Sequence, residues 1–127
     1  MSSLLENKVV RLKSSDNKIF EVDECIIMMS KTIKTMMEYL GSDDQVVIPL
    51  EKVDSKTLAL VGEWCANHLA KVKNTKFVEG LDLDVILHLM YTSYYLDIKE
   101  LGDQMRETIA DRAQMKAIEE ISEKFSF

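Results

Sequence analysis

Residues 30–41, SKTIKTMMEYLG, decide the front half of the fold, because they contain both ends and the buried face of one helix. Ser30 can cap the start of this helix, since its hydroxyl can accept a hydrogen bond from an amide that has no partner inside the first turn. Gly41 stands where a left-handed cap at the helix end is expected. Between these two residues, the apolar side chains recur at the spacing of one helical face: Ile33, Met36, Met37 and Leu40. The stretch therefore predicts a short amphipathic helix that packs on a core.

The residues before this helix predict a β-hairpin. Residues 8–14 and 19–22 are β-prone runs, and the turn-forming sequence Ser-Asp-Asn at 15–17 separates them. Val10 and Leu12 are expected to face the core. A short helix capped by Asp23 is expected to follow and to run through Met29.

The residues after Gly41 predict one more strand and a longer helix. Residues 46–48 form a brief apolar run that Pro49, which lacks an amide donor, ends or leaves at a sheet edge. A helix then runs from its cap at Asp54 to about Ala70. Its buried stripe is expected to contain these residues: Leu58, Leu60, Val61, Trp64 and Cys65. Residues 71–76 are polar and without periodicity, which favours a flexible joint.

From Leu81 onward the pattern is helical. Asp84 is a possible cap for a helix with one apolar face, Asp97 is expected to start another helix, and residues 115–125 are expected to form a last one. A mixed front half with a small sheet and an all-helical back half predict an α+β domain. With 127 residues, 46% of them hydrophobic, the chain can bury one substantial core, so one compact domain is expected.

Composition excludes several classes of function. The net charge of -6 disfavours nucleic acid and anionic membranes as partners, because surfaces that neutralise phosphates need clustered Lys and Arg. The amino-terminal segment lacks the apolar stretch of a secretory signal, and no segment approaches the length of a membrane span. The only two cysteines, Cys25 and Cys65, favour a reducing, intracellular location over a disulfide scaffold.

No enzyme or cofactor motif is evident. Cys65 and His68 lie one helical turn apart, but two ligands do not make a zinc site, and a buried thiol beside an ordinary imidazole is the simpler interpretation. The carboxylates of Asp43, Asp44, Glu119 and Glu120 are expected to be solvated. No glycine-rich phosphate loop is present. The clustered methionines at 28, 29, 36 and 37 are expected in the core rather than on an adaptable binding surface. We therefore expect neither a catalytic site, nor a metal, nor a cofactor.

Four segments occur in an order that resembles a known family: IFEVDE at 19–24, TIKTMME at 32–38, EWCANH at 63–68 and YLDIKEL at 95–101. Together with the ending EEISEKFSF at 119–127, they are similar to the S-phase kinase-associated protein family, the adaptors that hold F-box proteins onto cullins in SCF ubiquitin ligases. The resemblance implies a BTB/POZ-type fold. It divides the chain into a cullin-docking region, residues 1–95, and an F-box-binding helical extension, residues 96–127.

The resemblance also implies two sets of contact residues. Tyr94 and Tyr95 occupy the place of the family's cullin contact, although Tyr95 could equally end a helix against the core. The residues expected at the F-box contact are Gly102, Arg106, Ile109, Ala113, Ile121 and Phe125. Opposite them, an inward-facing stripe is expected at Leu101, Met105 and Thr108.

The chain departs from the family pattern in the F-box region. Gly102 and Arg106 stand where the family has apolar residues, and burying an unpaired guanidinium would cost several kcal/mol. On the sequence alone, Gly102→Leu and Arg106→Cys would rebuild an apolar stripe. The family also continues into one more helix after the position of Phe127, so the extension is expected to be truncated and the F-box repertoire restricted.

The resulting interpretation is a non-enzymatic adaptor in the cytoplasm and nucleus that bridges a cullin and F-box proteins. The alternative is a protein of the same fold that self-associates, for example as a homodimer, outside a ubiquitin ligase. The sequence does not specify which cullin or F-box protein is involved.

Overall fold

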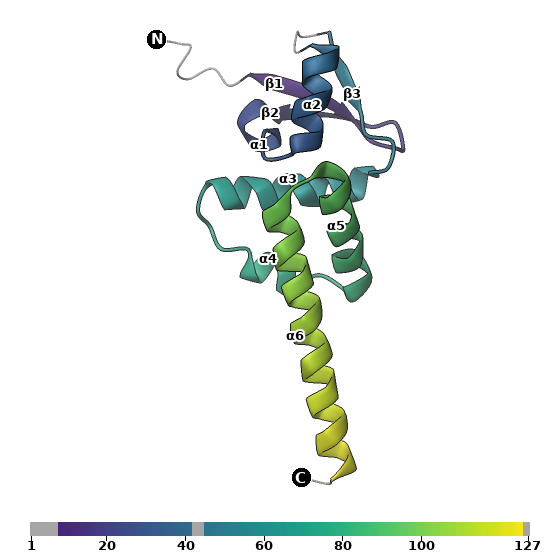
Figure 1. The fold of residues 1–127 in the computed structure, drawn as a ribbon, viewed down its shortest axis with the longest axis vertical. Helices are drawn as coiled ribbons and strands as arrows, with labels where there is room; N and C mark the ends of the chain where they lie inside the picture. The colour runs from purple at the N-terminus through teal and green to yellow at the C-terminus, as the bar shows by residue number, and fades with distance from the viewer. Residues whose placement is uncertain (1–7, 42–44, 126–127) are drawn as a thin grey trace.

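The computed structural model describes residues 8–41 and 45–125. It contains a small sheet covered by helices, followed by one long helix that extends well beyond the rest of the protein (Figure 1). The elements, in chain order, are β1 (Val9–Lys13), β2 (Ile19–Asp23), α1 (Glu24–Ile27), α2 (Lys31–Leu40), β3 (Val47–Pro49), α3 (Ser55–Leu69), α4 (Thr75–Glu79), α5 (Leu83–Leu96) and α6 (Lys99–Lys124). The predicted α+β class with a small sheet is confirmed.

The predicted hairpin is present, and β1 is the central strand of the sheet. β1 pairs with β2 in antiparallel register, with Leu12 opposite Phe20, and with β3 in parallel register, giving the strand order β2-β1-β3. Val10 and Leu12 are both buried, as their alternation in the strand predicts. Pro49 lies on the edge strand β3, where a missing amide donor is tolerated.

The hairpin turn also holds the start of α3. The Asp16 carboxylate accepts hydrogen bonds from the Ser55 amide at 2.8 Å and from the Ser55 hydroxyl at 2.6 Å. These bonds stabilise the charged form, so they lower the pKa of Asp16 below its ordinary value. Asp54 caps the same helix as predicted, because its carboxylate accepts from the Thr57 amide at 2.7 Å.

Helix α2 has the predicted cap at its start and a narrower buried face than predicted, and Gly41 at its end has a positive φ but not the left-handed helical conformation. The Ser30 hydroxyl accepts from the Ile33 amide, and Gly41 adopts a positive φ of 86° at the helix end. Ile33 and Met37 are buried, but Met36 is only half-buried and Leu40 is exposed. Of the two clustered methionines before the helix, Met29 packs on the core and Met28 is exposed. The core interpretation therefore holds for three of the four clustered methionines.

Two front-half predictions are wrong in detail. Asp23 makes no side-chain capping bond, and α1 ends at Ile27 rather than Met29. Residues 71–76 are not a loose joint, because Asn74 is buried within them. Its side chain bonds to the Asn67 side chain at 2.9 Å and to the Trp64 carbonyl at 3.3 Å, and α4 begins at the next residue. Polar composition predicted an exposed linker, but buried polar groups can be satisfied by hydrogen bonds, and here those bonds hold the segment against α3.

The back half contains fewer helix breaks than predicted. Asp84 lies in the first turn of α5 and the cap position is Asp82. Asp97 does not start a helix; it adopts a left-handed conformation, with φ of 53°, directly after α5. The predicted separate helix at 115–125 is part of α6, which runs unbroken from Lys99 to Lys124. The sequence between the two predicted helices contains no Gly or Pro, so nothing interrupts the backbone hydrogen bonds.

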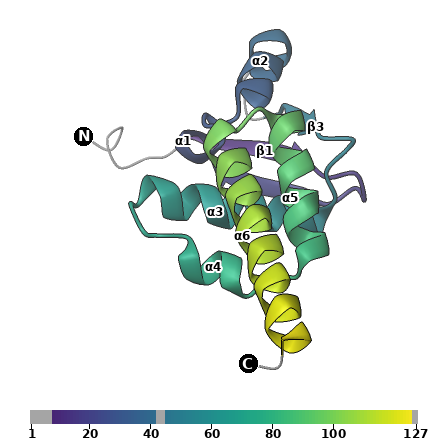
Figure 2. The same ribbon diagram turned by 60° about the horizontal axis from the view of Figure 1, so that its bottom comes forward.

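The long helix α6 is anchored only along its first half. Both views show this half beside α5, and the second half continues away from the other helices (Figures 1 and 2). Leu101 and Met105 are fully buried and join the single core cluster. Among the described residues, no helix is both long enough and apolar enough to cross a membrane.

Two helical glycines give a matched test of this packing. A Cβ at Gly62 in α3 would meet no atom within 4 Å, whereas a Cβ at Gly102 in α6 would lie 2.7 Å from the Ser93 hydroxyl. We predict that Gly62→Ala raises the free energy of unfolding by about 0.5–1 kcal/mol through helix propensity, and that Gly102→Ala lowers it by about 1–3 kcal/mol through overpacking.

Urea unfolding followed by the fluorescence of Trp64 measures both changes. Adding Ser93→Ala should restore most of the stability lost in Gly102→Ala, because it removes the atom that the new Cβ meets. Equal effects at the two glycines would contradict the α5–α6 geometry.

Candidate functional site

The surroundings of Cys65 and His68 do not favour thiol chemistry. Cys65 is buried, and burial, followed by the nearby Glu100 carboxylate, raises the pKa of its thiol to about 12. The His68 ring stacks on the ring of Trp64 at 4.9 Å between centroids. No group of three or more potential metal ligands occurs in residues 8–41 and 45–125. Glu119 and Glu120 are exposed as predicted, and Asp43 and Asp44 lie outside the described residues.

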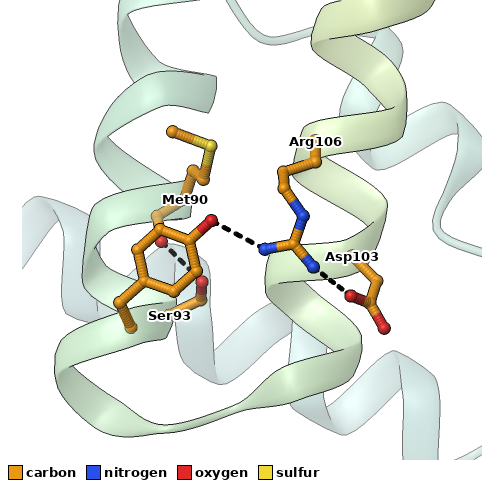
Figure 3. Close-up of polar contacts among 5 residues, drawn as sticks. Met90, Ser93, Asp103 and Arg106 are labelled. Atoms are coloured by element: carbon orange, nitrogen blue, oxygen red, sulfur yellow. Dashed lines mark hydrogen bonds and ion pairs between the residues drawn. The ribbon is translucent and has the colours of Figure 1, made fainter.

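The structure joins one predicted cullin residue to one predicted F-box residue. The Arg106 guanidinium donates a hydrogen bond of 2.7 Å to the Tyr94 hydroxyl and another to the Asp103 carboxylate (Figure 3). Its carbon lies 5.6 Å from the centre of the Tyr94 ring, within the range of a cation–π contact. We call Tyr94, Asp103 and Arg106 the α5–α6 cluster. The hydrogen bond to Tyr94 raises the pKa of Arg106 above its ordinary value, so the guanidinium stays charged.

This cluster changes the interpretation of Arg106. The sequence predicts an unpaired guanidinium at this position, which could be buried at low cost only beside an acid. In the structure Asp103, one turn earlier on α6, supplies that acid, and the side chain stays partly exposed. An exposed ion pair adds little stability by itself, but it lowers the cost of placing Arg106 at an interface.

Tyr95 packs against the core, as one of its two sequence interpretations predicts, and its place in a cullin contact stays a prediction. Its side chain is half-buried and packs against the core, while the Lys52 ammonium lies 5.8 Å from the centre of its ring. Its carbonyl accepts a hydrogen bond of 2.7 Å from the Thr32 hydroxyl at the start of α2. Tyr95 therefore ends α5 against the core and still presents part of an aromatic ring to solvent.

Sequence reasoning missed a third tyrosine on the same side of α5. Tyr91 is 66% exposed and Tyr94 is 55% exposed. Residues 91, 94 and 95 have the i, i+3, i+4 spacing of neighbours on one helical face. The same spacing in the sequence is sufficient to predict that Tyr91 shares a helical face with Tyr94 and Tyr95. We call these three residues the tyrosine surface.

Gly102 offers no surface to a partner. It is buried where α6 crosses α5, and the Ser93 hydroxyl that it approaches donates to the Met90 carbonyl (Figure 3). Any effect of Gly102 on partner binding must therefore act through the position of α6. The substitution Gly102→Leu, which the sequence suggested as a way to rebuild an apolar stripe, would instead clash with α5.

The remaining predicted F-box residues belong to two different faces of α6. Ile109 is half-buried against the core and Ala113 is exposed beside it. Ile121 and Phe125 lie farther along the helix and are 54% and 65% exposed. The buried stripe on the first half of the helix includes Leu101 and Met105, while the predicted Thr108 is only half-buried.

The second half of α6 has its own apolar stripe. Ile121 follows Leu101 by roughly five and a half turns, so it lies about 160° around the helix axis from the buried face. Ile118 and Phe125 lie within about 60° of Ile121 around the helix axis and are also exposed and apolar. Met115, one turn before Ile118, is a further exposed apolar residue beside them. We call the following residues the outer stripe: Met115, Ile118, Ile121 and Phe125. A helix that buries one face early and exposes an apolar face later has surface available for a partner.

Residues 8–70 match the Skp1 family tetramerisation domain. SKP1-like protein 14 of Arabidopsis thaliana is 36% identical over 94% of this chain and 83% of its own length. SKP1-like proteins 11 and 12 of the same plant are each 36% identical over 96% of this chain and 86% of their own length. This chain belongs to the Skp1 family.

Membership of the Skp1 family confirms the BTB/POZ-type fold. The matched region runs from just before β1 to the end of α3, so it contains the whole sheet. The similarity to the SKP1-like proteins extends over α4, α5 and most of α6 as well, since it covers 94–96% of the chain. The division of the chain at residue 95 stays a prediction.

The state of the two thiols provides a direct test of the non-catalytic interpretation. At pH 8 only about one Cys65 thiol in ten thousand is ionised, given its pKa of about 12, whereas Cys25 is exposed. We predict that the native protein reacts quickly with one equivalent of a thiol reagent and that the unfolded protein reacts with two. In a Cys25→Ser variant, rapid labelling of native Cys65 would contradict this geometry and reopen a thiol chemistry for the site.

Proposed function

We propose that this protein is an adaptor subunit of a cullin-based SCF-type ubiquitin ligase, which holds an F-box protein on a cullin scaffold. Its role is to join two partners rather than to catalyse a reaction. Membership of the Skp1 family supports the proposal in general terms. The observation that carries it is the outer stripe, because an exposed apolar stripe on a projecting helix needs a partner to cover it.

The proposed division of labour follows the two exposed surfaces. Residues 1–95 dock the cullin, with the tyrosine surface as part of the contact, and residues 96–127 bind the F-box protein through α6. Large aromatic side chains suit the first role, because they bury much area at low cost in conformational entropy. An apolar helical face suits the second, because it can lie against helices of a partner. The proposed role implies a location in the cytoplasm and nucleus.

The arrangement around Arg106 supports a restricted set of F-box partners. The guanidinium contacts Tyr94 of the tyrosine surface, stands on the same helix as the outer stripe and already has an acidic neighbour in Asp103. An F-box protein that covers this region must accommodate a charged, hydrogen-bonded group. A partner whose surface is purely apolar here would bind poorly, because it would bury the charge of Arg106 without a polar contact. Partner choice would then depend on polar groups that face Arg106.

A second candidate function is self-association through the outer stripe. The same exposure that favours an F-box partner also favours a second copy of this chain. In the first function an F-box protein covers Ile121, and in the second function another copy of this chain covers it. The F-box experiment below distinguishes them.

For the cullin surface, we predict that the double variant Tyr94→Lys, Tyr95→Lys weakens binding to a cullin amino-terminal region by about 2 kcal/mol, or roughly thirtyfold. The reason is the loss of two aromatic anchors. Calorimetric titration measures the affinity, and Tyr39→Lys serves as a control because Tyr39 is exposed at the far end of α2. Unchanged cullin affinity in a folded double variant would contradict the assignment. If the double variant unfolds, Tyr94→Lys alone tests it, since Tyr94 is exposed.

For the F-box surface, we predict that Ile121→Asp weakens binding of an F-box protein by about 2 kcal/mol or more, because it places a carboxylate in an apolar contact. Lys116→Asp is the matched control, since it adds the same side chain elsewhere on the exposed part of α6. Sedimentation of both variants without a partner tests self-association. If wild type is monomeric and Ile121→Asp binds the F-box protein normally, the outer stripe is not the contact.

A further inference from the structure

A cavity of about 250 Å³ lies between the sheet and α3. Its inner wall is made of core side chains that are almost fully buried, including Leu12, Ile33, Leu96 and Ile98. Its outer wall contains residues with partial access to solvent, including Phe20 of β2 and Ala59 of α3. The cavity is therefore a pocket with access from outside rather than a gap on the surface, and its lining includes no residue of the tyrosine surface or of the outer stripe.

The pocket lining offers few groups that could form a strong hydrogen bond with a ligand. The Ser30 hydroxyl accepts from the Ile33 amide and donates to the Leu96 carbonyl, so both of its functions are used. The Cys65 thiol is uncharged because burial raises its pKa to about 12. The other lining side chains are apolar, apart from Gly62, which has no side chain. Among the lining side chains, the one hydroxyl proton is already donated and the thiol is only a weak hydrogen-bonding group, so polar ligands would lose their bonds to water with little compensation.

The wall formed by α3 leaves unfilled space. Gly62 lines the pocket, and a Cβ added to it would meet no atom within 4 Å. Gly62 is partly exposed, so this open space lies at the outer side of the pocket. The glycine thus contributes to the volume of the pocket, and a larger residue at this position would reduce it.

We propose that this pocket binds a small apolar molecule with one aromatic ring. A dry apolar cavity of about 150 Å³ is large enough to hold benzene, so this pocket has room for a ring with one or two alkyl substituents. Binding is driven by the removal of apolar surface from water. Ligands that carry a hydroxyl or carboxylate group bind more weakly, because the pocket offers these groups few hydrogen-bond partners. An occupant would contact Leu96 and Ile98, which flank the corner between α5 and α6.

Toluene and phenol are a matched pair of probes for this proposal, since they differ by a methyl and a hydroxyl group on the same ring. Methyl-labelled protein titrated with toluene should show saturable NMR shifts at Ile33, Leu96 and Ile98. Phenol should bind roughly tenfold or more weakly, because its hydroxyl would be left without a partner. Absence of saturable shifts with toluene would overturn the proposal, as would equal binding of phenol.

Variants in the pocket wall locate the binding site. Gly62→Leu should lower toluene affinity by roughly tenfold or more, with Gly62→Ala in between, because the new side chains occupy the space of the ligand. Ala59→Leu is a second filling variant if Gly62→Leu does not fold, and Ala110→Leu on α6 is a control that should not change the affinity. Unchanged affinity in the folded filling variants would overturn the proposal. The proposal would also be overturned if the NMR shifts of these methyl groups changed with protein concentration and not with toluene. The pocket would then be filled by a side chain of another protein molecule.

Discussion

The Ser30 hydroxyl makes two hydrogen bonds, one local and one that joins distant parts of the chain. It accepts from the Ile33 amide, which caps α2, and it donates to the carbonyl of Leu96, 66 residues away, at the end of α5. The side chain is buried, so loss of either bond would leave a polar group without a partner and cost about 1–3 kcal/mol. The Thr32 hydroxyl and the Lys31 amide add bonds to Tyr95 and Asp97. The start of α2 thereby fixes the corner at which α5 ends and α6 begins.

Fixing that corner sets the direction of α6 and hence the position of both proposed contact surfaces. Asp97 adopts its left-handed conformation there, and Ile98 and Leu101 follow directly into the core. The first half of α6 is held by apolar burial, and the second half projects from the body (Figure 1). A rigid anchored half is what allows the projecting half to present an apolar stripe in a defined direction. In the proposed adaptor, the distance between cullin and F-box protein depends on this corner.

The two proposed surfaces are connected through the α5–α6 cluster. Tyr94 belongs to the tyrosine surface and Arg106 to the helix of the outer stripe, and a hydrogen bond of 2.7 Å joins them. A partner that reorients one of these side chains changes the environment of the other. Because both are partly exposed, this contact contributes more to the arrangement of the interface than to the stability of the fold.

The sequence by itself determined the features that depend on near neighbours. The sequence predicted the hairpin, the caps at Ser30 and Asp54 and the turn at Gly41, and it contained the family motifs. These features were accessible because capping bonds and apolar periodicity involve residues within a few positions of each other. Tertiary structure decided which faces meet. In the folded protein, Asn74 is buried in a segment that was predicted to be a linker. Gly102 lies close to Ser93, and Arg106 is hydrogen-bonded to Tyr94. Those outcomes depend on the close approach of α5 and α6 and of α3 and α4, and no local pattern encodes the distance between two helices.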